Sequence, residues 1–287
     1  MYDCIQSCIL NIIQSTQADA NHGQGREEGG AEMAIKVSQP DNGVVTLLMD
    51  RPAKHNAFTW EMYEAFGAAC DALQADDSVR CVIVRGAGGA FCAGSDIGGF
   101  DENRSGVEQA RAYAEFTLAM FDKFKHLRHP TIACIEGVCV GGGLEIAALC
   151  DIRIAQADAR FGIPVNRIGL TLDHQELADL VAVVGHGVAL EILLEGRVFG
   201  AQEALAKGLL SRVVDDAWGD ADETARRIAR LAPLSNRWHK QFIRQLQSGQ
   251  PLTQAQRDEA YACFDTQDYQ IGSRAFLEKQ RPQFIGR

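Results

Sequence analysis

The sequence predicts an α/β protein with a helical C-terminal region, and two observations lead to this fold class. Between residues 33 and 200, apolar runs of strand length alternate with segments whose apolar residues recur at helical spacing. From 201 to 287 the helical spacing continues, interrupted by one short strand-like run, RVVDD. This order favours a sheet with helices packed on it, followed by helices alone. The pattern leaves open whether the sheet is doubly wound or is a spiral of ββα turns.

The strands of the core are predicted from apolar runs that are bounded by turn residues. They are GVVTLLMD from Gly43, RCVIV from Arg80, TIACIEG from Thr131 and DIRIAQ from Asp151. ARFGIP, from Ala159, adds a short strand-like segment. Such runs are typical of strands that are buried within a sheet.

Helices are predicted where apolar residues recur every three or four positions. Thr59 can N-cap the helix TWEMYEAFGAACDALQ, and a second helix is expected over 107–127. VGGGLEIAALC is a third candidate. After Gly169, QELADLVAVVG, GVALEILLEG and AQEALAKGLL read as successive helices that stop at glycine. Residues 218–280 are expected to be helical, with a break at Pro233.

Composition limits the partners that this chain can have. The net charge of the 287 residues is -10, which disfavours nucleic acid as a partner because phosphate binding needs a basic surface. No apolar run reaches the roughly 20 residues of a membrane span. Residues 15–32 are polar and Gly-rich, and we expect residues 1–32 to form a disordered N-terminal extension before Met33.

The nine cysteines predict a reduced protein. Their number is odd and no CxxC pair occurs, so we expect buried thiols in a cytoplasmic protein. No His, Cys or carboxylate cluster has metal-ligand spacing, so no metal is expected. Cys92, in a Gly-rich loop, has the alternative of being a reactive thiol.

Two glycine-rich stretches are the candidate site. GAFCAGSDI follows a predicted strand but lacks GxGxxG, so it offers free backbone N–H groups near Ala93 and Gly94 rather than a dinucleotide site. VGGGLE opens a helix, where N–H groups are unpaired. N–H groups near Ala93 and Gly142 could together hold an oxyanion, with Glu145 beside them. Alternatively, the first stretch is a surface loop and Glu145 only complements the helix dipole.

These two stretches, in this order, resemble the crotonase, or enoyl-CoA hydratase/isomerase, superfamily. RPAKHNAF, FGIP, LLEGRVFGAQEALAKGLLSRVVDD and AFLEKQRPQFIGR extend the resemblance over most of the chain from Met33. The resemblance implies a crotonase-like ββα spiral over 33–230 that binds acyl-CoA. It also implies a helical C-terminal region, 231–287, through which the chain forms a homotrimer or a dimer of trimers.

The resemblance also implies the roles of individual residues. The thioester oxygen would accept hydrogen bonds from the N–H groups of Ala93 and Gly142, and Glu145 would move a proton beside it. Coenzyme A is then part of the substrate, and no separate cofactor is expected. The residues placed at or near coenzyme A are Arg51, Lys54, His55, Ala93, Asp96, Ile97, Gly142, Lys240 and Lys279. For the charged side chains the alternative is an ordinary surface charge, and Asp96 and Asp151 are expected to hold loops.

The chain departs from the hydratase pattern at one position. Hydratases carry a second glutamate twenty residues after the first, and here that residue is Val165. Hydration needs two proton-transfer tasks, whereas one carboxylate suffices to isomerise a double bond. Decarboxylation of a malonyl-type acyl-CoA and a non-catalytic acyl-CoA-binding role stay open as alternatives. Asp173 or His174 could supply the second task, although Asp173 could equally be an N-cap and His174 a surface residue; Asn166 could orient a water.

Overall fold

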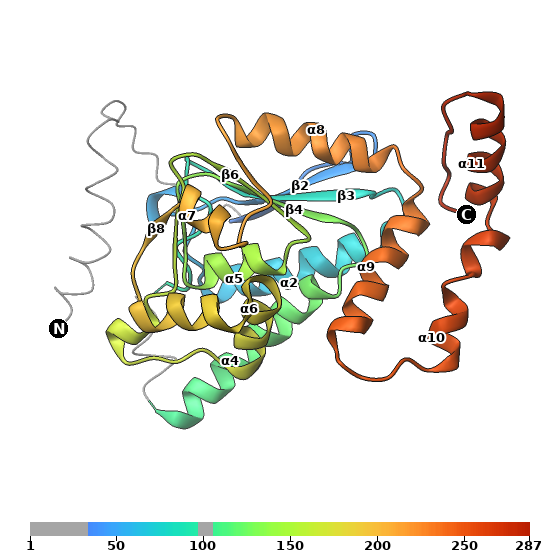
Figure 1. Ribbon diagram of the computed structural model, residues 1–287. Helices are drawn as coiled ribbons and strands as arrows, with labels where there is room; N and C mark the ends of the chain where they lie inside the picture. The colour runs from blue at the N-terminus through green and yellow to red at the C-terminus, as the bar shows by residue number, and fades with distance from the viewer. Residues whose placement is uncertain (1–33, 97–105) are drawn as a thin grey trace.

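The computed structural model of the chain describes residues 34–96 and 106–287 (Figure 1). The predicted extension, residues 1–32, and the predicted coenzyme A contact Ile97 lie outside the described residues.

The main sheet contains six strands in the order β1-β2-β3-β4-β6-β9. Their bounds are Ile35–Val37 (β1), Val44–Met49 (β2), Cys81–Gly86 (β3), Thr131–Ile135 (β4), Ile152–Gln156 (β6) and Arg212–Val214 (β9). The edge strand β1 pairs with β2 in the antiparallel sense, and the other neighbours are parallel. The sequence predicts five of these strands and misses β1, whose three residues include only one buried apolar side chain, Ile35.

A second, three-stranded sheet has the order β5-β7-β8. It is formed by Val138–Val140 (β5), Arg160–Gly162 (β7) and Phe199–Gly200 (β8). Only β7 is predicted from the sequence. The presence of β5 means that the glycine-rich helix begins at Gly142 rather than at Val140, because Val138–Val140 is extended.

The helices largely follow the predicted segments. Those from α2 to α7 are Trp60–Ala75 (α2), Val107–Lys125 (α4), Gly142–Leu149 (α5), His174–Glu195 (α6) and Ala201–Ala206 (α7). The remainder are Ala217–Ala229 (α8), Pro233–Gln247 (α9), Gln254–Glu259 (α10) and Gln267–Glu278 (α11). Short 3-10 turns cover Pro52–Lys54 (η2), Val165–Ile168 (η4) and Ala262–Asp265 (η5). Thr59 caps α2, accepting a hydrogen bond from the Met62 N–H, as predicted.

Two hydrophobic cores lie on opposite faces of the main sheet. α8 covers one face, and α2, α4 and α5 lie on the other (Figure 1). The smaller core joins the sheet to the alanines of α8 and comprises Val44, Cys81, Ile83, Ile132, Cys134, Ile154, Ala217, Ala221, Ala225 and Ala229. Small side chains on α8 let the helix approach the sheet closely. The chain therefore has the layered α/β architecture that the sequence predicts, with helices alone at its C-terminal end.

α6 is long and apolar enough to cross a membrane by length and composition, which is weak evidence on its own. Gly185 interrupts the helix with φ 75° and ψ 165°, as the predicted glycine stop requires. Each half is then shorter than the roughly 20 residues that a span needs. Only 17% of the most apolar stretch of α6 is buried. The helix therefore has an apolar surface that this chain alone does not cover.

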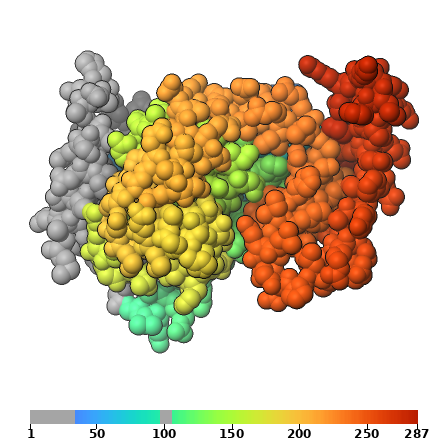
Figure 2. Space-filling view, viewed as in Figure 1, coloured from blue at the N-terminus to red at the C-terminus, as the bar shows by residue number. Residues whose placement is uncertain are grey.

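The C-terminal helices extend from one side of the molecule (Figure 1). A groove of about 440 Å³ separates α9 from α6 (Figure 2). Leu149 and Asp151 are among the residues that line it. The predicted boundary between residues 230 and 231 falls in the short connection between α8 and α9.

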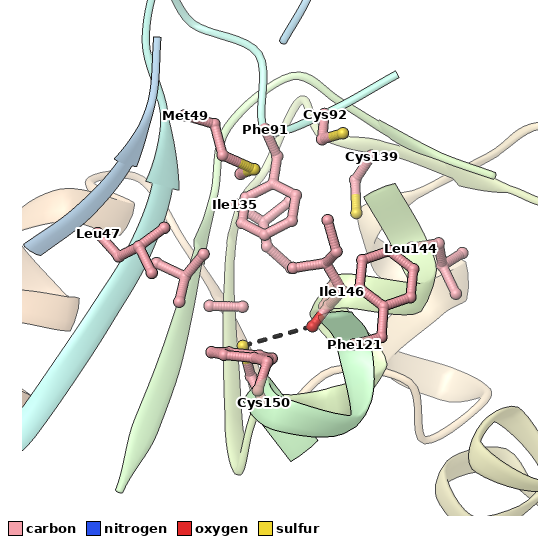
Figure 3. Packing of buried hydrophobic residues seen from close by; sticks show 14 of the residues in the cluster. Leu47, Met49, Phe91, Cys92, Phe121, Ile135, Cys139, Leu144, Ile146 and Cys150 are labelled. Atoms are coloured by element: carbon pink, nitrogen blue, oxygen red, sulfur yellow. Dashed lines mark hydrogen bonds between the residues drawn. The ribbon is translucent and has the colours of Figure 1, made fainter. Parts of the chain in front are cut away.

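α5 is held by its apolar side chains in the larger core. Figure 3 shows Leu144 and Ile146 of α5 among Phe91, Cys139 and Phe121, which come from other segments of the chain. Six of the seven cysteines in residues 34–96 and 106–287 are buried, and all seven are free thiols, which agrees with the predicted reduced core. The N-terminus of α5 is thus fixed by packing before any ligand binds.

Candidate active site

The segment 51–58 holds the first glycine-rich loop by backbone pairing. The His55 carbonyl accepts a hydrogen bond from the Ala93 N–H at 2.9 Å. Phe58 donates its N–H to the Gly94 carbonyl and accepts from the Asp96 N–H, each at 2.8 Å. Residues 51–58, RPAKHNAF, therefore clamp the loop that follows β3, in the sense that they hold it by backbone hydrogen bonds.

Side chains of the same segment complete the clamp. The buried amide of Asn56 donates to the carbonyls of Ala90 (2.7 Å) and Ala87 (3.0 Å), while its oxygen accepts from the Arg51 N–H at 2.8 Å. The Arg51 guanidinium forms an ion pair with Asp96 at 2.7 Å. Both charged residues thus hold the loop, as expected for Asp96, and Arg51 is already engaged within the protein.

The second glycine-rich stretch lies directly against this loop. Cys92 donates its N–H to the Val138 carbonyl (2.9 Å) and accepts from the Val140 N–H (3.1 Å). Gly141 has φ 54°, a left-handed value that favours glycine. A Cβ on Gly143 would overlap the Cys92 carbonyl. The glycines are therefore needed for the turn into α5 and for its contact with the loop.

Two backbone N–H groups meet at this contact, and one of them differs from the prediction. A Cβ on Gly142 would lie 3.7 Å from the Ser95 nitrogen, so the N–H groups of Gly142 and Ser95 are neighbours. Neither donates to another group within residues 34–96 and 106–287. The N–H of Ala93, the predicted donor, is not available to a ligand because it is bonded to the His55 carbonyl. The N–H of Ser95 is available instead, since Phe58 bonds to the residues on either side of Ser95.

Glu145 lies beside this pair of donors. It belongs to the first turn of α5, and its Oε2 would be 3.8 Å from a Cβ on Gly142. The structure therefore brings together Gly142 and Glu145, as the sequence predicts, and adds Ser95. A negative charge that forms on a ligand at the two N–H groups would be next to a proton acceptor and at the positive end of a helix.

A cavity of about 20 Å³ opens next to Glu145, between α4, α5 and α6. Its apolar wall comprises Leu118, Phe121, Leu144, Ala148, Leu149, Ile163 and Leu180. Its polar lining, besides Glu145, comprises Lys125, Gln175, Glu176 and Asp179, none of which the sequence singles out. Lys125 and Asp179 form an ion pair at 2.6 Å that joins α4 to α6.

The candidates for a second proton-transfer group do not line this cavity. Asp173 is exposed and N-caps α6, where it accepts from the Gln175 N–H at 2.8 Å. His174 is exposed, and Asn166 donates its amide to the Leu193 carbonyl at 2.8 Å. Asp173 is thus a helix cap and His174 a surface residue, which are the alternatives that the sequence leaves open. In the first turn of α6, Gln175 and Glu176 line the cavity instead.

Val165 does not supply a polar group either. It begins η4 and packs against the larger hydrophobic core. The position where hydratases have a second carboxylate is therefore occupied here by part of the core.

Two of the lysines that were predicted to contact coenzyme A lie away from the glycine-rich site or are buried. Lys240 is wrong for this role because it is buried, donates to the His129 carbonyl and pairs with Asp151, both at 2.7 Å. Burial lowers the pKa of this lysine. Lys279 is exposed at the end of α11, which Figure 1 places well apart from α5 of the same chain. Lys54, also exposed, and His55 lie next to the clamped loop.

Asp151 has the structural role expected of it. Its carboxylate accepts from the Thr131 N–H (2.7 Å) and hydroxyl (2.9 Å) as well as pairing with Lys240. It therefore joins β4, the end of α5 and α9.

Cys92 is not a reactive thiol. It is fully buried, and burial raises its pKa to about 12, so the nucleophilic thiolate is scarce at neutral pH. Across the described ranges, 34–96 and 106–287, no group of three or more His, Cys, Asp or Glu side chains is arranged to hold a metal ion.

A polar pair adjoins the N–H group of Ser95, and the sequence gives little sign of it. The Tyr63 hydroxyl, on α2, is 2.9 Å from the Ser95 hydroxyl. Burial raises the pKa of Tyr63 well above its usual value, and the neighbouring Tyr113 and the negative charge of Glu145 raise it further. A tyrosine on the buried face of an amphipathic helix is the one signal that sequence reasoning could have used.

Comparison with known proteins identifies the family. The family model described as enoyl-CoA hydratase/isomerase matches residues 39–287. A crystal structure of an enoyl-CoA hydratase/carnithine racemase from Magnetospirillum magneticum superposes with a TM-score of 0.86 at 42% identity, covering 90% of this chain and 97% of that one.

Curated relatives carry more than one activity name. A short-chain-enoyl-CoA hydratase of Clostridium acetobutylicum is 32% identical over 87% of this chain and 97% of its own length. A 1,2-epoxyphenylacetyl-CoA isomerase of Escherichia coli is 30% identical over 89% of this chain and 100% of its own length. The fold, the glycine-rich site and these similarities agree: the chain is an enzyme of the enoyl-CoA hydratase/isomerase family, with the crotonase fold, and acts on acyl-CoA.

Proposed function

We propose that the protein moves a proton on an acyl-CoA thioester through an enolate whose oxygen is bound by the N–H groups of Ser95 and Gly142. The observation that carries the proposal is the position of these two donors beside one carboxylate, Glu145. Coenzyme A is part of the substrate in this proposal. Lys54 and His55, which lie next to the loop after β3, would contact it.

The chemistry follows from where charge develops. Removal of a proton from the carbon next to a thioester places negative charge on the thioester oxygen. Preorganised backbone donors stabilise such charge, and loss of one donor typically costs a factor of about 10² to 10³ in rate. Glu145 is placed to accept the proton because its carboxylate is next to Gly142.

Double-bond isomerisation is the reaction that the site supports best. Glu145 removes a proton from C2 of a 3-enoyl-CoA, which gives a dienolate, and returns it to C4, which gives the 2-enoyl-CoA. One carboxylate performs both steps, so the apolar Val165 is no obstacle.

Hydration is the second candidate, and the polar lining of the cavity favours it. Water addition needs one group that activates water and one that protonates C2. Glu176 and Gln175 line the same cavity as Glu145 and lie on the opposite helix. Glu176, which also accepts a hydrogen bond from the Asp173 N–H, replaces Asp173 and His174 as the group to test for the second task, and Gln175 is placed to orient the water.

The test is a panel of thioesters with wild-type protein: 3-hexenoyl-CoA, crotonyl-CoA and malonyl-type acyl-CoA. Isomerisation of 3-hexenoyl-CoA faster than hydration of crotonyl-CoA is the expected result. Rapid hydration with slow isomerisation would replace isomerisation by hydration. Loss of CO2 from the malonyl-type thioester as the fastest reaction would indicate a decarboxylase, and binding without turnover across the panel would indicate a non-catalytic acyl-CoA-binding protein.

The small cavity next to Glu145 supports a short acyl chain. Its volume of about 20 Å³ holds on the order of one methyl group. We expect kcat/KM for a six-carbon enoyl-CoA to exceed that for a twelve-carbon one by at least about tenfold, because each misplaced methylene costs roughly 1–3 kcal/mol. Leu118→Ala, which widens the cavity, is expected to reduce this ratio by about tenfold. Val107→Ala, on the exposed start of the same helix, is the control. An unchanged ratio in Leu118→Ala would place the acyl chain elsewhere.

We also propose that copies of the chain assemble as a homotrimer or a dimer of trimers. α6 combines a mean hydropathy of 1.9 with little burial, and the C-terminal helices expose large apolar side chains, as an interface requires. The most exposed on these helices are Ile243, Leu246, Phe264, Phe276 and Leu277, and Tyr261 is exposed in the turn between α10 and η5. The buried, reduced cysteines support a location in the cytoplasm or another reducing compartment.

The double variant Phe276→Glu/Leu277→Glu is expected to shift the protein to monomers. The two side chains are 84% and 81% exposed in the single chain, and a carboxylate buried there by a second chain would lack a partner. Size-exclusion chromatography with light scattering measures the mass. Val107→Glu, 77% exposed on α4, is the matched control and should leave the mass unchanged. A monomeric wild type, or an unshifted double variant, would contradict assembly through α11.

A further inference from the structure

Ser95 carries a hydroxyl at the point where its own N–H faces a ligand. This hydroxyl is 2.9 Å from the phenol oxygen of Tyr63, whose residue is only 2% exposed. Ser95 itself is half-buried, so it lies between the buried phenol and the space next to Gly142. The pair links α2 to the oxyanion donors.

The surroundings of Tyr63 are otherwise aromatic. Its ring lies 4.9 Å from Phe58, 5.6 Å from Phe121 and 6.1 Å from Tyr113, centroid to centroid. A buried hydroxyl without a partner is destabilising, so this phenol is held to the polar atoms within reach. Those are the hydroxyls of Ser95 and Tyr113.

The 2.9 Å contact lets either hydroxyl donate. A phenol donates one hydrogen bond and accepts others. A ligand oxygen that accepts from the Ser95 hydroxyl leaves Ser95 Oγ to accept the phenol hydrogen of Tyr63. Burial and the charge of Glu145 keep that phenol protonated, so it retains the hydrogen that this arrangement needs.

We propose that the Ser95 hydroxyl is a third donor to the enolate oxygen, and that Tyr63 is a positioning residue that orients this hydroxyl. The inference rests on the proposed function and assigns two further side chains to that site. The N–H and the hydroxyl of one serine can converge on a single oxygen, with Gly142 donating from the other side. Tyr63 acts through Ser95 and has no contact with substrate of its own.

The test uses acetoacetyl-CoA, whose enolate has a near-ultraviolet absorbance that reports stabilisation of the oxyanion without turnover. Ser95→Ala removes the hydroxyl and keeps the N–H, and Tyr63→Phe removes the phenol oxygen and keeps the ring. Ser95→Ala is expected to reduce the bound enolate-to-keto ratio about tenfold or more, as for a hydrogen bond to a charged group. Tyr63→Phe is expected to reduce it severalfold, and the double variant should lose no more than Ser95→Ala.

Binding of a thioester that forms no enolate is the second readout. A residue with a purely structural role would change this affinity as well. Butyryl-CoA, which forms no stable enolate, is expected to bind the three variants as it binds wild type. Glu223→Gln, at a glutamate that is largely exposed on α8 and lies outside the site, is the control and should leave both readouts unchanged.

Each other outcome contradicts a definite part of the proposal. An enolate ratio in Ser95→Ala equal to wild type would overturn the third donor. A Tyr63→Phe loss that adds fully to that of Ser95→Ala would overturn positioning through Ser95, and so would an equal loss of butyryl-CoA affinity. If wild type neither binds acetoacetyl-CoA nor changes its enolate ratio, the proposed function fails, and the inference fails with it.

Discussion

Glu145→Gln is expected to lower kcat by a factor of about 10² to 10⁴ on whichever enoyl-CoA the wild type turns over best, because an amide cannot accept the proton from C2. Glutamine keeps the size of the side chain, so the contact with Gly142 and the cavity lining should be retained. Steady-state kinetics and the dissociation constant for a non-reacting acyl-CoA are the two measurements. The loss should be confined to kcat, with the dissociation constant within about twofold of wild type.

Glu223→Gln is the control for this experiment, since that glutamate is largely exposed on α8 and lies outside the site. Normal turnover by Glu145→Gln would show that Glu145 only complements the dipole of α5, which is the alternative that the sequence leaves open. Loss of acyl-CoA binding in the variant would instead show that the carboxylate shapes the site.

Asp151→Ala is expected to lower the free energy of unfolding by about 3–5 kcal/mol, because it leaves the ammonium of Lys240 buried without its counter-charge. The side chain of Lys240 is only 6% exposed, so its ammonium would lose the group that compensates for its burial. The measurement is urea denaturation at one fixed protein concentration, since assembly would add to the apparent stability. α9 should be the first element to lose protection from hydrogen exchange.

The double variant Asp151→Ala/Lys240→Met separates charge from packing. Methionine fills part of the same space without a charge, so the double variant should regain a large share of the stability that Asp151→Ala loses. The hydrogen bonds from Thr131 to Asp151 remain lost in both variants. Equal stability of the single and double variants would mean that these bonds, rather than the buried ammonium, account for the effect.

Much of the fold is predictable from the sequence because its signals are local. The strands from Val44 to Gln156 are long apolar runs, and Thr59 and Gly185 mark a helix start and a helix break by their own chemistry. Gly142 and Glu145 also follow from local order, since a glycine-rich turn at the start of a helix exposes N–H groups wherever it occurs. The strands β1, β5 and β8 have two or three residues and leave no such signal.

The remaining parts of the site depend on contacts between distant segments. Whether the N–H of Ala93 or of Ser95 is available is decided by His55 and Phe58, which are nearly 40 residues earlier. From the sequence, Lys240 is expected to be a surface cation on an amphipathic helix. Its burial is explained only by the position of its partner, Asp151. Such pairings cannot be deduced from spacing in one chain, because they depend on how the sheet brings the segments together.

The N–H groups of Ser95 and Gly142 lie on segments that follow strands of different sheets, β3 and β5, and these segments meet where Cys92 pairs with Cys139. Apart from a change to proline, no substitution can delete a backbone N–H. In the proposed function, the capacity to bind an enolate therefore belongs to the backbone at the junction between the sheets. Side chains around it, such as Val165 and Glu176, can then differ while that capacity is kept, and we expect them to determine which reaction the enolate undergoes.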